Sequence, residues 1–337
     1  MKSSKKVKKF ILDNISKHEK DIIQIAINHF GISRQAIHKH MNRLIKENKV
    51  IAHGATKGRY YELIPIVNFV KTVNLNSNFN PNSIIKDYVL PHLEFLPKNI
   101  FEIFEFSTGV LLNNVKDHSG ASSVYYKLFI SYQEAHFIIN DNGIGIFEHI
   151  KSALKLTSNR LAALELAKGQ ANSDSHKHSG DELNAVINLF DNVKIESSGK
   201  LLRFLNSKKE WTIEHSPQIK GSRIHLKIKS SSSRTCSEVF DKIFQIDQNK
   251  IRIPLNLLGL SESKIVNPRG KAESVLRNIN KYHKVEFDFK SIDLIGPSFA
   301  NELIRKTKEK NKTVDIKWIN TNKTVDLLMS RALGRQA

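Results

Sequence analysis

The sequence contains very little of two things on which whole classes of protein depend, cysteine and long apolar runs. Its 337 residues include a single cysteine, Cys236, so no disulfide can form within the chain, as expected in a reducing compartment. No Cys/His cluster has the spacing of zinc ligands. No apolar run approaches the ~18 residues of a transmembrane helix, and the basic N-terminus lacks the apolar core of a secretion signal. We therefore predict a cytoplasmic protein with no membrane partner.

Acidic residues are also scarce relative to basic ones, and the imbalance is uneven along the chain. The sequence has 53 Lys and Arg against 33 Asp and Glu, a net charge of +20. Residues 1–60 hold 14 basic and 4 acidic residues, which is half of that net charge. Such a local excess favours a polyanionic partner, nucleic acid first, and the alternative is a lysine-rich solvated face. The chain is long enough for two or three domains.

The N-terminal residues carry a pattern of short helices separated by tight turns. Apolar positions at helical spacing predict helices over 7–16 and 21–30, the second ending at Gly31. Ser33 is placed to cap a third helix, which runs to about Asn48. A short helix, a glycine turn and a second capped helix are typical of a helix-turn-helix.

Two strand-like segments, 50–52 and 59–63, follow the third helix and predict a hairpin. With them, residues 5–64 resemble the winged helix-turn-helix of bacterial regulators, and we assign residues 1–64 to a first domain. The resemblance implies DNA as a partner, with the third helix facing base edges and the wing facing phosphates. The alternative is a winged helix used for protein contacts. The expected DNA-contacting residues are Arg34, Gln35, His38, Lys39, Arg43, Lys57 and Arg59.

Three polar motifs in a fixed order mark the middle of the chain. The first motif lies at the C-terminal end of a predicted helix over 103–119. The residues of this motif share one face of that helix. The second, Asp-x-Gly-x-Gly, follows an apolar strand; its carboxylate can accept from an exocyclic amine, and its glycines allow a purine ring close to the backbone. The motif residues are Asn114, Asp117 and His118, then Asp141, Gly143 and Gly145, then His178, Ser179 and Gly180.

In order and spacing these motifs resemble the ATP-binding domain shared by gyrase, Hsp90, histidine kinases and MutL, the GHKL family. The resemblance covers roughly residues 95–225, within a predicted domain over 96–229 that follows a connector over 65–95. It implies ATP and Mg²⁺ as cofactors: Asn114 holds the magnesium, Asp141 binds adenine, and the other motif residues contact the nucleotide. The alternative is that these are ordinary helix-surface and turn residues.

Two departures from the family pattern bear on catalysis. Family members that turn over ATP carry a general-base Glu four residues before the magnesium Asn, and Val110 holds that position here. Valine cannot accept a proton. Glu182 follows the third motif where another glycine is expected, and its charge would repel a triphosphate. We therefore assign no catalytic residue and expect turnover to be impaired or absent.

The C-terminal third alternates strand-like segments with helical ones, which predicts an α/β domain over 236–337. About residues 236–335 resemble the STAS-like domain, related to anti-anti-sigma factors, through Phe287-Asp288-Phe289 and the run from Ser298 to Leu303. Anti-anti-sigma factors carry a phosphorylated Ser in the turn before this helix. Pro297 holds that position here, so Ser298 is a candidate phosphoacceptor, and a helix-capping hydroxyl is the favoured alternative.

The sequence thus predicts an α+β multidomain protein with a winged helix-turn-helix, a GHKL α/β sandwich and a small STAS-like α/β domain. The favoured hypothesis is a DNA-binding regulator with an ATP-binding middle domain, whose C-terminal domain contacts a protein partner or the middle domain itself. One alternative is a slow ATPase or an anti-sigma-type Ser kinase, and Val110 is the main point against it. Another is a non-catalytic protein-interaction scaffold. A homodimer is plausible for all three, because many GHKL proteins dimerise.

Overall fold

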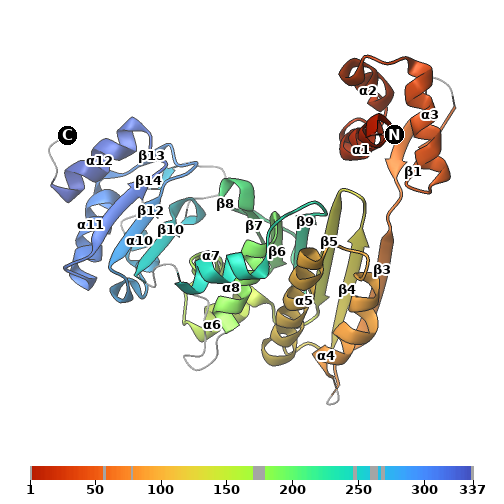
Figure 1. Cartoon of the computed structure of the whole chain (residues 1–337). Helices are drawn as coiled ribbons and strands as arrows, with labels where there is room; N and C mark the ends of the chain where they lie inside the picture. Colours follow the sequence, from red (N-terminus) through yellow and green to blue (C-terminus); the bar gives the residue numbers. More distant parts are fainter. Residues whose placement is uncertain are drawn as a thin grey trace.

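The computed structural model describes residues 2–55, 58–76, 79–169, 179–245, 249–258, 265–266 and 270–334. Over these ranges the chain is a mixed α+β protein in three successive parts: a small helical module, a seven-stranded antiparallel sheet with helices, and a parallel sheet with helices (Figure 1). None of the helices described is both long and apolar enough to cross a membrane. Lys57 and His178, named above as candidate site residues, lie outside the described ranges.

The N-terminal module (residues 2–64) has three helices and a hairpin. Gly31 ends the second helix in the left-handed conformation (φ 63°), and Ser33 Oγ accepts from Ala36 N at 3.3 Å to cap the third. These two predicted boundaries are confirmed. The elements are α1 (Lys2–Asn14), α2 (Ile22–Phe30), α3 (Arg34–Lys46), β1 (Val50–His53) and its antiparallel partner β2 (Tyr60–Leu63).

This module has a hydrophobic core of its own, separate from that of the rest of the chain. Ile11 of α1, Ile22 of α2 and Ile37 of α3 are fully buried in it. Tyr61 of β2 closes the core, and its backbone N–H donates to Glu19 O at 3.0 Å. Because the module buries its apolar residues without help from the other parts, it has the internal packing of an independent unit.

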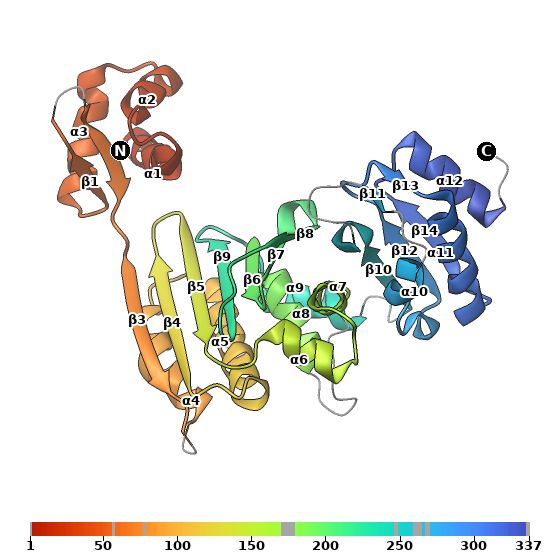
Figure 2. The ribbon, with the colours of Figure 1, turned by 180° about the vertical axis from the view of Figure 1, so that it is seen from behind.

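The middle part is a sheet in the order β3-β4-β5-β9-β6-β7-β8, all antiparallel. Buried and partly exposed residues alternate along β4 and β5, as expected for a sheet covered on one face, and Figure 2 views β3, β4 and β5 with α5 behind them. The strands are β3 (Val67–Asn74), β4 (Ser123–Ile130), β5 (Glu134–Asp141), β6 (Asn192–Ser197), β7 (Lys200–Leu205), β8 (Glu210–His215) and β9 (Ser222–Lys229). The helices are α4 (Pro81–Ile84), α5 (Lys98–His118), α6 (Ile146–Ala153), α7 (Asn159–Ala167), α8 (Ser179–Leu189) and α9 (Cys236–Phe240).

Residues 65–95 were predicted to be a connector, and the structure instead places a strand of the sheet there. β3 pairs antiparallel with β4 along its whole length, from Val67–Ile130 to Asn74–Ser123. Val67, Phe69 and Val73 of this strand pack against the common core. The alternation of apolar and polar residues was the available signal, but the Asn- and Ser-rich stretch that follows it obscured the strand.

The C-terminal part contains two small parallel sheets flanked by helices. Phe287 and Asp288 of its central strand are buried, as in other parallel strands covered on both faces. One sheet has the order β10-β12-β14 and the other pairs β11 with β13. The strands are β10 (Lys250–Pro254), β11 (Ile265–Val266), β12 (Lys284–Asp288), β13 (Leu294–Ile295) and β14 (Asp315–Ile319), and the helices are α10 (Gly270–Val275), α11 (Pro297–Lys310) and α12 (Lys323–Leu333).

The middle and C-terminal parts share one continuous hydrophobic core, and a buried ion pair lies at their boundary. Lys168 Nζ is 2.8 Å from Glu165 Oε1, and the two side chains are 0% and 1% exposed. The same ammonium donates to Val275 O at 3.2 Å and to Arg277 O at 3.5 Å, at the end of α10. Lys168 therefore satisfies carbonyls at the C-terminus of a helix in the other part, where positive charge is favourable.

Candidate functional site

A pocket between α5, β5, α6, α8 and the start of β9 brings residues of the first two sequence motifs together. It encloses about 730 Å³, including the space open to solvent. Asn114 and His118 line it from α5, and Asp141 and Gly145 line it from the end of β5 and the loop beyond. Four motif residues from two distant segments thus face one cavity.

Asp141 contributes a carboxylate to the lining of this pocket and is only 6% exposed. Its Oδ1 accepts from Gly143 N at 2.8 Å and its Oδ2 accepts from Ser222 N at 3.2 Å. Burial raises the pKa of Asp141, and these backbone hydrogen bonds oppose that rise. A carboxylate has about four lone-pair positions, so Asp141 can accept from a ligand donor as well.

Three glycines around Asp141 are required by close backbone packing. A Cβ on Gly143 would lie 2.1 Å from Ser119 O, at the end of α5. A Cβ on Gly221, which has φ of 78°, would lie 2.0 Å from Asp141 O, and one on Gly145 would lie 2.9 Å from Gly221 O. Gly143 and Gly145 were predicted to let a ligand approach the backbone, and the structure shows that the nearest neighbours of all three glycines are other protein segments.

Ser222 and His149 belong to the pocket and were not identified from the sequence. Ser222 Oγ accepts from Ile146 N at 2.8 Å, which joins the start of β9 to the start of α6. The rings of His149 and His118 lie close together at the pocket wall, tilted, with centroids 5.1 Å apart. Neither residue lies in a motif, and the Gly221-Ser222 pair at the start of β9 was the only local signal for Ser222.

Asp117, Val110 and Glu182 were also singled out from the sequence and are not among the residues that line this pocket. Asp117, expected on the same helix face as Asn114, is exposed and does not line it. Ser179 and Gly180 form the first turn of α8, whose Leu183 does line the pocket. Val110 is 5% exposed and packs in the hydrophobic core. Glu182 is exposed and is absent from the described lining.

Apart from Lys57, which lies outside the described ranges, the residues predicted to contact DNA are wholly or partly exposed on the N-terminal module. Arg34, Gln35, Lys39 and Arg43 lie along α3, and His38 is exposed only in part. Arg59 is exposed beside the hairpin, with its guanidinium 5.3 Å from the centre of the Tyr61 ring. Burial lowers the pKa of His38, and the charges of Arg34 and Arg59 lower it further. Arg34 of α3 and Arg59 of the hairpin both lower the pKa of the same imidazole. The helix and the hairpin therefore contribute to a common basic surface.

The predicted capping role of Ser298 is wrong. Helix α11 begins at Pro297, its N-cap is Gly296, and no side chain caps it. Proline is well suited to the first helical position, because its missing N–H has no partner there. The helix therefore starts earlier than a Ser298 cap would require. Ser298 is exposed in the first turn, and its role as a phosphoacceptor stays a prediction.

Within the described ranges no group of three or more His, Cys, Asp or Glu side chains is arranged to hold a metal ion. Asn114 was predicted to bind magnesium together with a nucleotide. That site needs no cluster of protein ligands, because the phosphates of the nucleotide supply further ligands. The half-buried carboxamide of Asn114, at the pocket wall, suits that role chemically.

Comparison with known proteins identifies one segment of the chain. Residues 271–326 match the family described as a STAS-like domain of unknown function (DUF4325), so this segment is a STAS-like domain. It lies inside the predicted range 236–337 and contains β12, α11 and β14, while β10 extends the same sheet ahead of it. No curated protein and no solved structure matches the chain.

Proposed function

We propose that this protein is a DNA-binding regulator whose middle domain, a GHKL-type sandwich, binds ATP with Mg²⁺ and turns it over slowly or not at all. The observation that supports this best is the pocket itself. Asn114, His118, Asp141 and Gly145 were named from separate motifs, and all four line it. Asp117, predicted from the same motif as Asn114, is not among the lining residues, so the pocket supports the proposal for four of the predicted motif residues and not for this one.

The pocket has the chemistry that an adenine base requires. Asp141 supplies a buried acceptor for the exocyclic amine, and Ile139 and Ile224 supply apolar contact for the ring. Asn114 lines the same cavity, and its carboxamide oxygen is a hard ligand of the kind that Mg²⁺ prefers. The metal, when bound with the nucleotide, would neutralise phosphate charge.

Slow turnover follows from the residue at the general-base position. Val110 is buried in the core, so a water molecule could not be activated from this position of α5. The loss of a general base typically costs 10²–10⁴ in rate. We infer that nucleotide occupancy, rather than hydrolysis, is the property on which regulation depends.

Replacing Asp141 with Ala should weaken Mg-ATP binding to the full-length protein by about 10- to 100-fold, because a buried hydrogen bond to a charged group is lost. Isothermal titration calorimetry measures this directly. Asp117→Ala is the matched control: it removes a carboxylate from the same motif set, yet Asp117 is exposed and outside the pocket, so affinity should not change. Equal losses in both variants, or no binding of millimolar ATP to the wild type, would refute the proposal.

The N-terminal module supports the DNA-binding part of the proposal. It has three helices followed by an antiparallel hairpin, the order of elements in a winged helix-turn-helix. The outer side of α3 carries Arg34, Lys39 and Arg43, and Arg59 lies close enough to the helix to influence His38. Cations from the helix and the hairpin can therefore reach phosphates on one duplex.

We expect Arg59→Ala to weaken binding of labelled duplex DNA by a similar factor for every sequence and to reduce the slope of log K against log salt by about 1. Fluorescence anisotropy over a range of salt concentrations gives both quantities. Lys17→Ala, which removes an exposed cation from the turn between α1 and α2, is the control and should leave the slope close to that of the wild type. A folded wild-type protein without measurable affinity for any duplex would favour the alternative of protein contacts.

A further inference from the structure

A second cavity lies where the middle part meets the C-terminal sheet. It encloses about 520 Å³, including space open to solvent, and shares no lining residue with the first pocket. From the middle part, Asn184 and Asn188 of α8 line it together with Lys209 and Trp211. From the C-terminal part, Arg252 of β10 faces the same space. The cavity is therefore completed only when the two parts are docked.

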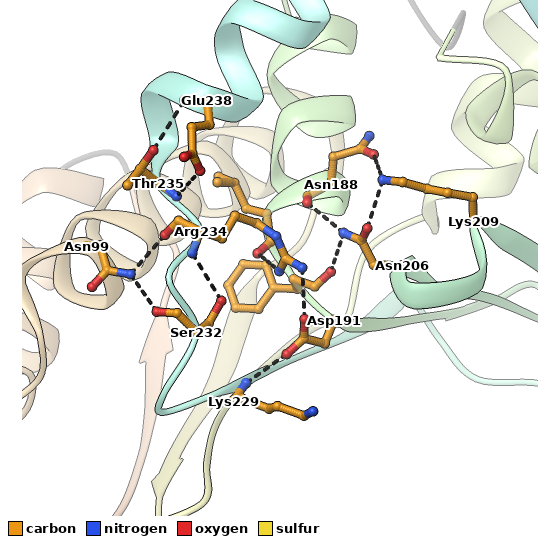
Figure 3. A network of polar contacts seen from close by, with 12 residues as sticks. Asn99, Asn188, Asp191, Asn206, Lys209, Lys229, Ser232, Arg234, Thr235 and Glu238 are labelled. Atoms are coloured by element: carbon orange, nitrogen blue, oxygen red, sulfur yellow. Dashed lines mark hydrogen bonds and ion pairs between the residues drawn. The ribbon is translucent and has the colours of Figure 1, made fainter.

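The described lining of this cavity is rich in hydrogen-bond donors and includes no acidic residue. Its polar side chains are two cations, two carboxamides and an indole. The Lys209 ammonium donates to neutral oxygens, Asn206 Oδ1 at 2.8 Å and Asn188 Oδ1 at 3.5 Å (Figure 3). Among the described residues no carboxylate lies within ion-pair distance of this ammonium, so its charge is left without a counter-ion.

Arg252, the second cation, keeps part of its donor capacity. Its Nε and Nη2 donate to Asp288 Oδ2 at 3.2 and 2.7 Å. That carboxylate is also shared with Lys290 N and Asn320 Nδ2, which donate to Oδ1. Asp288 thus holds the guanidinium in a fixed orientation by one edge and leaves the Nη1 donors for another acceptor.

Other charges near the cavity reinforce its positive character. Partial burial lowers the pKa of Lys209, and the charges of Arg234, Lys242 and Arg252 lower it further. Acids in this region have partners: Asp288 pairs with Arg252 at 2.7 Å, Asp191 with Arg234 at 2.9 Å (Figure 3) and Glu210 with Lys290 at 3.4 Å. Lys209 and Arg252 thus bring positive charge to the cavity from the two sides of the boundary. An anion bound between them would reduce their mutual repulsion.

We propose that this interdomain cavity binds a small molecule through a phosphate group, held by Lys209 from the middle part and by Arg252 from the C-terminal part. Phosphate oxygens accept well from both an ammonium and a guanidinium. The rings of Phe204 and Trp211, with centroids 4.6 Å apart, form an apolar wall for the remainder of the ligand. Because the two cations come from different parts of the chain, occupancy stabilises the docking of the STAS-like domain on the middle domain.

The test uses the fluorescence of Trp211 in the full-length chain. The sequence has two tryptophans, so in a Trp318→Phe background Trp211 is the reporter. Titration with inorganic phosphate at constant ionic strength should give a saturable change in emission that chloride does not give. Ribose 5-phosphate is the second probe: tighter binding than phosphate indicates an organic phosphate, and equal affinity indicates free phosphate.

Two variants and two controls decide the outcome. Lys209→Met and Asn184→Asp should each weaken phosphate binding by about 10- to 100-fold, the first by removing a charged hydrogen bond and the second by repulsion at nearly constant volume. Lys208→Met, at the neighbouring position that is not among the lining residues, should have no effect, and neither should Asp141→Ala. The inference is overturned if phosphate gives no saturable response, if Lys208→Met weakens binding as much as Lys209→Met, or if Asp141→Ala abolishes the response. None of these results bears on ATP binding measured by calorimetry.

Discussion

Replacing Lys168 with Met should lower the free energy of unfolding by about 3–5 kcal/mol, because the change leaves a buried carboxylate without its partner. Glu165 is 1% exposed and its Oε1 lies 2.8 Å from Lys168 Nζ, so water cannot replace the lost ammonium. The two carbonyls at the end of α10 lose their donor as well. Denaturant unfolding followed by circular dichroism gives the free-energy difference.

The chain offers a closely matched control for this prediction. Glu148 and Lys151 have the same i,i+3 spacing and a separation of 2.7 Å, but their side chains are 39% and 30% exposed. Lys151→Met should therefore cost less than about 1 kcal/mol. The double replacement Glu165→Met with Lys168→Met should recover most of the loss, because apolar pairs often substitute for buried ion pairs. Equal effects of Lys168→Met and Lys151→Met would show that the two parts of the chain do not dock in solution.

Replacing Gly221 with Ala should have the second largest effect, a loss of about 2–5 kcal/mol of stability together with weaker Mg-ATP binding. Gly221 has φ of 78°, and its added Cβ would lie 2.0 Å from Asp141 O and 2.6 Å from Asp141 Oδ1. Either the loop before β9 or the end of β5 must move. Both movements displace Ser222 N from Asp141, whose orientation is central to the proposed adenine contact.

Gly120→Ala separates the backbone cost from the steric one. Gly120 also has positive φ, 60°, but no atom lies within 4 Å of the position that its Cβ would take. Only the left-handed conformation is then penalised, at about 1–2 kcal/mol, and ATP affinity should not change. Denaturant unfolding and calorimetry on both variants provide the comparison. A Gly221→Ala variant as stable as Gly120→Ala would mean that the close approach to Asp141 is not maintained in solution.

Features set by a few neighbouring residues could be predicted from the sequence. Gly31 and Ser33 define the turn between α2 and α3 because their effects reach only one helical turn. Ser198 and Gly199, with φ of 50° and 69°, form the two-residue hairpin turn between β6 and β7, which adjacent residues also set. Errors arose where local signals competed. At Ser298 a capping hydroxyl and a preceding proline pointed to different helix starts, and the proline prevailed.

The candidate site could be predicted only in part, for the same reason. Asn114, His118 and Asp141 lie in motifs whose spacing is visible along the chain, and the structure places all three at the pocket. Asp117 shares a helix with Asn114 and is nevertheless exposed. The direction of a side chain on α5 relative to the cavity depends on how that helix packs on the sheet, and spacing along the helix does not determine it.

By itself the sequence determined the helices and hairpin of the N-terminal module, its basic charge and the three polar motifs, because periodicity, capping and composition act over short distances. The tertiary structure decided what surrounds those motifs. β9 inserts between β5 and β6, so Ser222 reaches Asp141 across 81 residues of chain. The docking of the C-terminal sheet likewise brings Arg252 to the cavity that Lys209 lines. Such pairings depend on which apolar faces bury one another, and this is a property of the whole core rather than of any segment.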